Sequence, residues 1–306
     1  MDGSREPAWA GRRVRPLRAR LEEARRRRGV QWDVLERDYL LSWILAGVGQ
    51  VPVLRDTLVF KGGTALKKCY FGDYRFSEDL DFSGLDGLPE GDSLGAAMRE
   101  AGAAAVRLLD EYAPVELTCE RYVERAPHPR GQEAFTLRAR LPWQSRPQIR
   151  VMIEITVDEP VLWPVKSRSV MHDYEEPLDA ALQVYSLEET VAEKLRAILQ
   201  QADMHASRGW SRSRARDYYD LWRVLGTYRD RMDFTGFVPL LREKCAVRGV
   251  GFEGPEDFFQ SAMLAEVERT WDQSLALLVP GLPAIETVID DLRPEVATIL
   301  GPNERR

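Results

Sequence analysis

Apolar residues recur along this chain with two spacings, and the change between them predicts its organisation. Up to about residue 186, segments of helical spacing alternate with short segments in which every second residue is apolar, a pattern typical of strands. After that point the helical spacing continues to the end of the chain. We therefore expect an α+β fold, in which an N-terminal domain built on a mixed sheet is followed by an all-helical C-terminal domain.

Three regions follow from this division. Residues 1–31 form a basic N-terminal extension that is expected to be partly helical, residues 32–186 form the sheet domain, and residues 187–306 form the helical domain. Ser186 is followed three residues later by Glu189, a capping-box pattern that predicts the start of a helix at this boundary.

The same patterns predict individual elements. After ten residues that we expect to be disordered, a thin apolar stripe predicts a helix from about Pro16, which Gly29 would end. Denser apolar spacing predicts a core helix at 32–48, and an alanine-rich segment predicts another at 92–112. Strands are expected at 57–60, around 79–83, at 115–123, 134–141 and 148–157 and within 174–186, with a turn at 127–131 and later helices at 187–203, 213–228, 234–246, 255–276 and 284–300.

A glycine pair after the first strand precedes two aspartates on the next strand. Gly62 and Gly63 allow a backbone to approach phosphate closely, and a helix that starts at Thr64 would direct free N–H groups at the anion. Asp79 and Asp81 share one face of their strand, because side chains alternate along it. Two such carboxylates repel each other unless a cation lies between them, and oxygen ligands suit Mg²⁺ or Mn²⁺. The stretch predicts a site for a nucleoside triphosphate and its metal.

Glu154 is a carboxylate in the middle of an apolar strand, where it is costly to bury unpaired. It either lies at a sheet edge or pairs with Arg138 or Arg140, or it is a third acidic group beside Asp79 and Asp81.

Other polar residues near these segments are candidates for contacts with the substrate. Lys61 and Lys68 flank the glycine turn and can contact phosphates, although simple solvation is the alternative for either lysine. Ser77 shares the face of the acidic pair, so its hydroxyl can line the site. Lys194 lies on the boundary of the apolar face of its helix, where it can place an ammonium group at the edge of a cleft. Asp217 can orient Lys194 or a substrate hydroxyl, and the alternative is an interhelical ion pair of little energetic value.

Several of these segments resemble motifs of one protein family. LVFKGGTAL followed by FSEDLDFS is similar to the first motif of the AbiEii/AbiGii toxins, which include the MenT toxins and belong to the polymerase-beta-like nucleotidyltransferase superfamily. SLEETVAEKLRAILQ and SRARDYYDLW resemble its later motifs, so the resemblance extends over residues 32–228. It departs from the superfamily at Gly63, where many members have serine, and the N-terminal arginines match no motif.

The resemblance implies a nucleotidyltransferase fold and a metal-dependent toxin of a type IV toxin–antitoxin or abortive-infection system. Such an enzyme transfers a nucleoside monophosphate from an NTP to an acceptor, here expected to be the 3′ end of tRNA, and its partner is an AbiEi-like antitoxin. The alternatives are a protein hydroxyl or small molecule as acceptor, or a nucleotide- or RNA-binding module without catalysis. The resemblance implies roles for Asp79, Asp81, Glu154, Lys194 and Asp217 in catalysis, with Asp79, Asp81 and Glu154 as metal ligands and Lys194 in nucleotide binding. From their positions beside the turn and the acidic pair, we add Gly62, Gly63, Thr64, Lys68 and Ser77 as candidate nucleotide contacts.

The distribution of charge adds a second candidate function to the acidic site. Residues 1–30 contain ten arginines and four acids, so their balance is +6, and the net charge of −6 leaves −12 for the rest. Basic patches on an acidic protein can contact nucleic-acid phosphates, but a solvated helix face is an equal alternative for residues 12–28. A second basic cluster precedes Asp217, and its candidate RNA contacts are Arg208, Arg212, Arg214 and Arg216.

Composition limits the setting in which the protein works. The shares of hydrophobic and charged residues, 44% and 30%, are those of an ordinary globular protein. Cys69, Cys119 and Cys245 lie far apart, which argues against a disulfide framework or a zinc motif and favours a reducing cytoplasm. No apolar run is long enough to span a membrane, and the charged N-terminus lacks the apolar core of a signal peptide.

Overall fold

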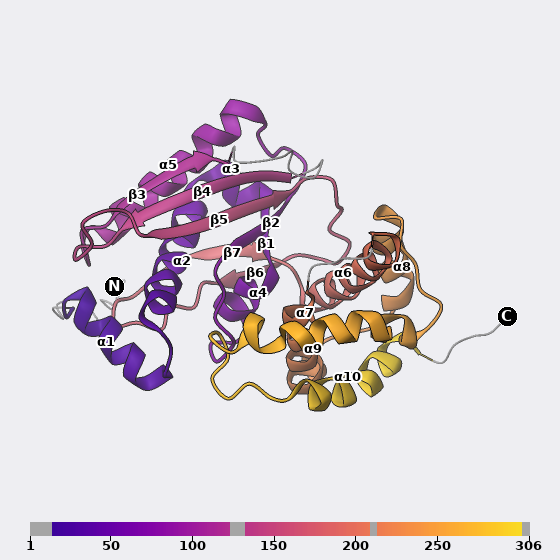
Figure 1. Cartoon of the computed structure of the whole chain (residues 1–306). Coiled ribbons are helices and arrows are strands. Elements are labelled where there is room, and N and C mark those ends of the chain that lie inside the picture. Colours follow the sequence, from indigo (N-terminus) through magenta and orange to yellow (C-terminus); the bar gives the residue numbers. More distant parts are fainter. Residues whose placement is uncertain (1–13, 123–131, 209–212, 302–306) are drawn as a thin grey trace, which may run out of the picture.

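The computed structural model describes residues 14–122, 132–208 and 213–301, and its centre is a seven-stranded mixed sheet (Figure 1). The strand order is β3-β4-β5-β2-β1-β7-β6. The central strand β2 pairs in parallel with β5 and antiparallel with β1, and β1 pairs in parallel with β7. The strands are β1 (Leu58–Lys61), β2 (Leu80–Gly84), β3 (Glu116–Arg121), β4 (Gln132–Arg140), β5 (Ile149–Thr156), β6 (Lys166–Ser169) and β7 (Ala181–Val184).

Along the chain, helices precede the first strand, lie between strands and follow the last strand. In the first part of the chain they are α1 (Leu17–Arg28), α2 (Trp32–Gln50), α3 (Pro52–Thr57), α4 (Gly62–Ala65) with the π-helical turn η1 (Leu66–Tyr70), and α5 (Gly91–Leu109). After the last strand they are α6 (Leu187–Arg208), α7 (Ala215–Tyr228), η2 (Arg229–Arg231), α8 (Phe237–Val247), η3 (Pro255–Phe259), α9 (Ser261–Leu275) and α10 (Ile285–Leu300).

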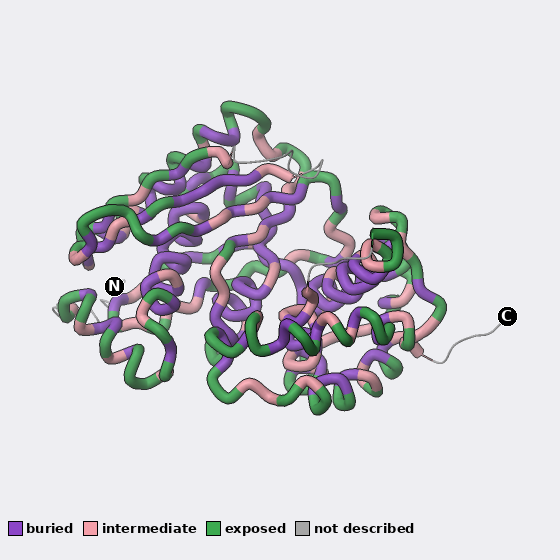
Figure 2. Tube along the Cα trace, in the orientation of Figure 1, coloured by how far each residue is buried: buried purple, intermediate pink, exposed green. Residues whose placement is uncertain are grey.

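The two faces of the sheet differ in polarity. Phe60, Phe82, Ile153 and Ile155 point to the face that α2 and α5 cover, and all four are almost completely buried. In Figure 2 the chain is coloured as buried along much of the central strands. Within each strand, the residues that alternate with these four point to the opposite face of the sheet. Glu154, between Ile153 and Ile155, is one of them and remains partly exposed. This alternation is the one that the sequence of β5 predicts, and it directs the polar residues of the central strands towards the later helices.

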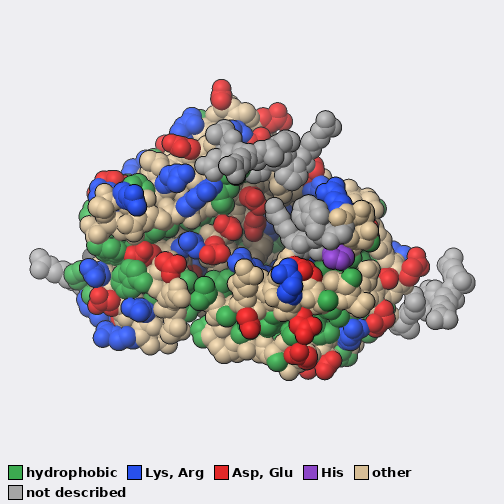
Figure 3. Space-filling view, viewed as in Figure 1, with side chains coloured by type: hydrophobic (Ala, Val, Ile, Leu, Met, Phe, Trp, Pro, Cys, Tyr) green, Lys and Arg blue, Asp and Glu red, His purple; other side chains and the backbone are tan. Residues whose placement is uncertain are grey.

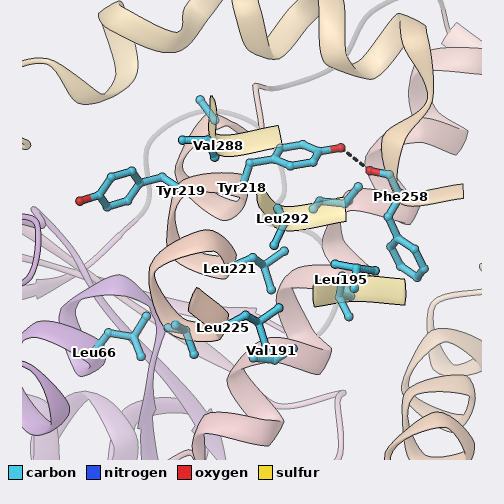
Figure 4. Close-up of a cluster of buried hydrophobic side chains, with 14 of the residues drawn as sticks. Leu66, Val191, Leu195, Tyr218, Tyr219, Leu221, Leu225, Phe258, Val288 and Leu292 are labelled. Carbon is cyan, nitrogen blue, oxygen red and sulfur yellow. Dashed lines mark hydrogen bonds between the residues drawn. The ribbon is translucent and has the colours of Figure 1, made fainter. Parts of the chain in front are cut away.

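Helices α6 to α10 form a second unit, the helical lobe, which has its own apolar core, whereas β1 to β7 with α1 to α5 form the sheet lobe (Figure 1). In Figure 4, Val191 and Leu195 of α6 meet Leu221 of α7 and Leu292 of α10. The Tyr218 hydroxyl donates a hydrogen bond to a backbone carbonyl, that of Phe258, at 2.5 Å, which satisfies a buried polar group within this core. Leu66 of η1 also joins the cluster, so the two lobes share part of one core.

The predicted α+β fold is confirmed, with differences in single elements. The helix expected at 255–276 is two elements, because the 3₁₀ turn η3 ends before Gln260, whose backbone is extended. Neither α3 nor β6 was predicted; β6 is four exposed residues and has no alternation of burial that a pattern of apolar residues would reveal. The predicted disordered segment 1–10 and the turn at 127–131 lie outside the described residues, and the domain boundaries stay predictions.

Candidate active site

The glycine turn after β1 lies between two charged side chains. Gly62 has a φ of +78°, and a Cβ at this position would lie 2.5 Å from Oδ2 of Asp81. A Cβ on Gly63 would lie 2.9 Å from Cζ of Arg75. Both glycines are therefore required by close approach of a charge, and Gly62 also by its left-handed backbone conformation. Thr64 donates a hydrogen bond from its hydroxyl to the carbonyl of Asp79 at 2.6 Å, which ties the turn to the start of β2.

Asp81 and Glu154 lie directly opposite each other on the parallel strands β2 and β5, and Lys61 lies opposite Asp81 on β1. Burial and the nearby charge of Glu154 raise the pKa of Asp81 to about 7, against the opposing effect of Lys61. The structure thus brings together the two carboxylates that the sequence placed more than seventy positions apart.

Asp79 precedes β2 rather than belonging to it, because the strand begins at Leu80. Its side chain is exposed at the edge of the site yet crowded by protein. Partial desolvation raises its pKa, the charges of Glu78 and Glu154 raise it further, and Arg216 and Arg37 lower it. Asp79 therefore belongs electrostatically to the same cluster as Asp81 and Glu154, although it lies one residue before the strand on which we predicted it.

Neither alternative that would make Glu154 an ordinary structural carboxylate matches its surroundings. Its strand β5 lies between β4 and β2, inside the sheet. Arg140 pairs with Glu116 through its Nε at 2.7 Å, and Arg138 lies opposite Arg150, four residues along β5 from Glu154. Four residues of a strand span about 13 Å. Glu154 is thus held in the acidic site by the register of the sheet.

Whether a metal ion fits the site depends on how the carboxylate oxygens of Asp79, Asp81 and Glu154 are arranged. Among the described residues, no group of three or more His, Cys, Asp or Glu side chains is already arranged to hold a metal ion. The three-carboxylate centre of Asp79, Asp81 and Glu154 stays a prediction. Mg²⁺ is commonly held by one or two carboxylates together with substrate phosphates. The in-register pair Asp81 and Glu154 fits that requirement, with Asp79 at the edge.

Lys61 links the acidic pair to the helical lobe. Its buried ammonium group donates to Oε1 of Glu193 on α6 at 3.0 Å and to Oγ1 of Thr156 at 3.2 Å. The sequence predicts a phosphate contact or simple solvation for Lys61, and it does not indicate the pair with Glu193. The signal for this pair was weak, because a lysine at the end of a four-residue strand is usually solvated.

Lys194 lies one residue after Glu193 and reaches a different set of partners. Its ammonium group is 3.0 Å from Oδ1 of Asp217 and 2.7 Å from Oδ2 of Asp220, both on α7. Burial would lower the pKa of Lys194, but the two carboxylates outweigh that effect and raise it. The structure thus places Lys194 and Asp217 in contact, an arrangement that the positions of the two residues allowed as either an orienting contact or an interhelical ion pair.

Two members of this cluster were missed by sequence analysis. Asp220 accepts two hydrogen bonds from Arg75, at 2.6 Å from Nε and 2.7 Å from Nη2, and it is completely buried. Burial would raise the pKa of Asp220, yet Arg75 and Lys194 lower it to about 2. The available signal was the second aspartate of the segment RDYYD, three residues after Asp217 and so on the same helix face.

Other predicted contacts lie in different surroundings. Lys68 is 3% exposed and its ammonium group is 2.9 Å from Oδ1 of Asp38, so the structure does not bring it to the acidic site. Ser77 is half-buried two residues before Asp79. Of the predicted RNA contacts, Arg208 is exposed, Arg214 pairs with Asp217 at 3.2 Å, Arg216 pairs with Glu78 at 3.2 Å, and Arg212 lies outside the described residues.

The space-filling view shows where these groups meet the surface. A hollow lies between the sheet lobe and the helical lobe, with acidic side chains inside it and Lys and Arg side chains around its rim (Figure 3). A polyphosphate with a divalent cation combines the two charges that such a surface can bind.

Comparison with known proteins covers most of the chain. The sequence model of a family described as nucleotidyl transferase AbiEii toxin, type IV TA system, matches residues 43–300. The fold is similar to that of MenT4, a nucleotidyltransferase toxin from Mycobacterium tuberculosis H37Rv, with a TM-score of 0.60 and 22% sequence identity over 94% of this chain and 90% of MenT4. No curated protein matches the sequence significantly.

Proposed function

Because the chain belongs to the AbiEii family of nucleotidyltransferase toxins of type IV toxin–antitoxin systems, we propose that it transfers a nucleoside monophosphate from an NTP to the 3′ end of tRNA. The observation that carries this proposal is the register of Asp81 with Glu154 beside the glycine turn. A modified 3′ end can no longer accept an amino acid, so the reaction would block translation.

The acidic residues would act on the α-phosphate and on the attacking hydroxyl. A bound Mg²⁺ or Mn²⁺ would neutralise developing charge on the phosphates, and Asp81 and Glu154, with Asp79, would hold it. Glu154 would also accept the proton of the acceptor hydroxyl. Gly62 and Gly63 leave room for the triphosphate close to the backbone, because neither carries a side chain.

Lys194 would hold the triphosphate from the other side. An ammonium group has three N–H donors, and two are directed at Asp217 and Asp220. The third donor remains for a phosphate oxygen, while the two aspartates fix the position of the nitrogen. In this proposal Asp217 orients Lys194 and does not contact the reacting atoms.

The setting of the reaction follows from its acceptor and its family. The substrate tRNA is cytoplasmic, so we propose that the protein acts there. Membership of a toxin–antitoxin family implies a cognate antitoxin as partner, which we propose to be AbiEi-like. Among the described residues, no helix combines the length and apolar character that crossing a bilayer requires.

Incubation with each of the four labelled NTPs, Mg²⁺ and total tRNA tests the proposal. We expect label on tRNA with the wild type and none with Asp81→Asn. If the label appears on a protein or on a small molecule instead, the acceptor is not tRNA, and the same site acts on that other acceptor. A second test is growth of a bacterial host that expresses the Asp79→Ala variant. If this variant still inhibits growth and no acceptor is labelled, the protein is a binding module and not an enzyme.

A further inference from the structure

Glu78, which neighbours Asp79, joins two arginines from different lobes. Its Oε1 accepts a hydrogen bond from Nη1 of Arg37 on α2 at 2.5 Å, and its Oε2 is 3.2 Å from Nη2 of Arg216 on α7. Both guanidinium groups also lower the pKa of Asp79, so they lie within electrostatic reach of the acidic site. One carboxylate therefore holds two cations at the edge of that site.

Structural stabilisation alone is a poor explanation for this arrangement. The side chains of Arg37, Glu78 and Arg216 are 22%, 38% and 41% exposed, and ion pairs of this kind contribute little to stability. Glu78 also adds negative charge beside Asp79, where carboxylates already repel one another. The Nε atom of Arg37 is buried, and it has no hydrogen-bond partner among the described residues. Arg37 thus keeps a donor that Glu78 does not use, whereas Nε of Arg216 donates to the backbone carbonyl of Ser274 at 3.4 Å.

We propose that Arg37 and Arg216 form a subsite for the terminal phosphates of the substrate triphosphate, and that Glu78 occupies this subsite until the triphosphate displaces it. The inference rests on the proposed nucleotidyl transfer. Guanidinium groups bind phosphate through two parallel hydrogen bonds, and a terminal phosphate carries more negative charge than a carboxylate. Because Arg37 and Arg216 come from the two lobes, a bound triphosphate would connect the lobes through both arginines.

Glu78 then acts as a competitor that lowers the affinity for triphosphate. Removing its charge frees both arginines without altering their positions on α2 and α7, so Glu78→Gln is expected to bind inorganic triphosphate more tightly. Loss of either arginine is expected to weaken binding, because each charge-assisted contact with phosphate contributes about tenfold in affinity. A merely structural role for Glu78 predicts the opposite for Glu78→Gln, namely unchanged or weaker binding.

Isothermal titration of the full-length protein with inorganic triphosphate tests the subsite. We expect Glu78→Gln to bind about tenfold more tightly than the wild type, and Arg37→Gln and Arg216→Gln to bind about tenfold more weakly. Arg223→Gln is the matched control, because Arg223 is also on α7 and also pairs with a sheet-lobe carboxylate, Asp73, at 3.7 Å. Thermal denaturation of each variant shows that it is folded at the temperature of the titration.

Three outcomes would overturn the subsite. They are unchanged or weaker binding by Glu78→Gln, unchanged binding by both arginine variants, and an equal loss with Arg223→Gln. An arm with tRNA and no triphosphate separates the two sources of phosphate: a loss of tRNA binding alone in Arg216→Gln would assign that arginine to the RNA backbone. The titration needs no acceptor, so absence of label on tRNA refutes the proposed transfer and leaves the subsite intact.

Discussion

Gly63 has no room for a side chain, because the guanidinium group of Arg75 lies against its Cα and is fixed by Asp220. We expect Gly63→Ala to lower nucleotide transfer at least tenfold, since an added methyl group must displace either Arg75 or the turn that faces the substrate. Overpacking of this kind lowers the free energy of unfolding by about 1–3 kcal/mol. Both quantities are measurable, by label transfer and by chemical denaturation.

Gly226 supplies the control for this prediction. It lies within α7, and an added Cβ would meet nothing within 4 Å. Gly226→Ala is therefore expected to keep full activity and to raise the free energy of unfolding by up to about 1 kcal/mol, because alanine is the better helix former. Equal behaviour of the two variants would show that the contact with Arg75 does not restrict Gly63.

The raised pKa of Asp81 predicts how stability changes with pH. Its folded pKa of about 7 lies above its ordinary value of 3.8, so the folded state favours the protonated carboxyl. The contribution of this carboxyl to the free energy of unfolding is therefore fully present below about pH 4, and it is lost as the pH rises through about 7. Asp81→Asn removes this loss, so the variant should gain stability relative to the wild type between pH 4 and pH 8, on the order of 1–2 kcal/mol after solvent screening.

Denaturation of both proteins in urea across this pH range measures the difference. Addition of Mg²⁺ at pH 8 should stabilise the wild type and leave Asp81→Asn unaffected, because a cation between the carboxylates replaces the proton. A constant difference between the two proteins from pH 4 to pH 8 would contradict the assigned pKa.

Single residues differ in how far the sequence reveals them. The side of its own strand on which Asp81 or Glu154 lies was predictable from strand alternation, whereas the position of Glu154 opposite Asp81 was one of several alternatives that the sequence left open. Arg75 and Asp220 were not predictable, because the contact between them joins positions 145 residues apart and no local pattern encodes it. Lys68 illustrates the converse, since its proximity in sequence to the glycine turn says nothing about Asp38, its partner on another helix.

At the level of elements, α6 connects the parts of the site. It presents Glu193 to Lys61 of β1 and Lys194 to the aspartates of α7. One turn earlier, Glu189 pairs with Lys244 of α8 at 2.6 Å and accepts hydrogen bonds from the backbone of the segment that follows β5. The capping box predicted at Glu189 is therefore only half formed, because its carboxylate serves these partners instead.

The pair of Glu189 with Lys244 gives a prediction for α6. Both side chains are completely buried, so Lys244→Met leaves a carboxylate without its cation. We expect this change to lower the free energy of unfolding by about 3 kcal/mol. The control Arg293→Met breaks an exposed pair with Glu256 and should cost less than about 1 kcal/mol. Urea denaturation that gives equal losses for the two variants would show that α6 is not anchored by this pair.

Elements with strong periodicity were predicted well, and elements fixed by tertiary contacts were not. The dense apolar segment of α2 is a helix that is buried on all sides from Asp38 to Val48, and the alternation of β5 corresponds to its buried face. The π-helical turn η1 has no such signature: its Phe71 N–H bonds the carbonyl of Leu66, five residues back, and its shape follows from how it packs between the lobes.

At the scale of the whole molecule, the site exists only because two lobes meet. The sheet lobe supplies the acidic pair and the glycine turn, and the helical lobe supplies Lys194 and its aspartates. Motifs in the sequence indicate both halves of the site, but no local pattern in the sequence determines how the two halves are placed relative to each other. Their relative position depends on Arg75 and Lys61, two cations of the sheet lobe that pair with carboxylates of the helical lobe.

The sequence likewise does not reveal which of the N-terminal arginines are exposed, and in the structure their charges do not all face solvent. Arg20 is buried and pairs with Glu176, and Arg28 pairs with Asp173, so these two attach α1 to the segment between β6 and β7. Arg25 and Arg27 are exposed on the same helix. Only part of the basic extension is therefore available to a nucleic acid.

This division predicts how α1 contributes to RNA binding. We expect the double variant Arg25→Gln/Arg27→Gln to bind tRNA more weakly, with a salt slope reduced by about 1–2, because two phosphate contacts are lost. The KM for NTP should not change, since α1 contributes no side chain to the acidic site. The control Arg99→Gln/Arg107→Gln removes the same charge from exposed positions on α5. If both double variants reduce the salt slope equally, net charge and not α1 determines how strongly the protein binds RNA.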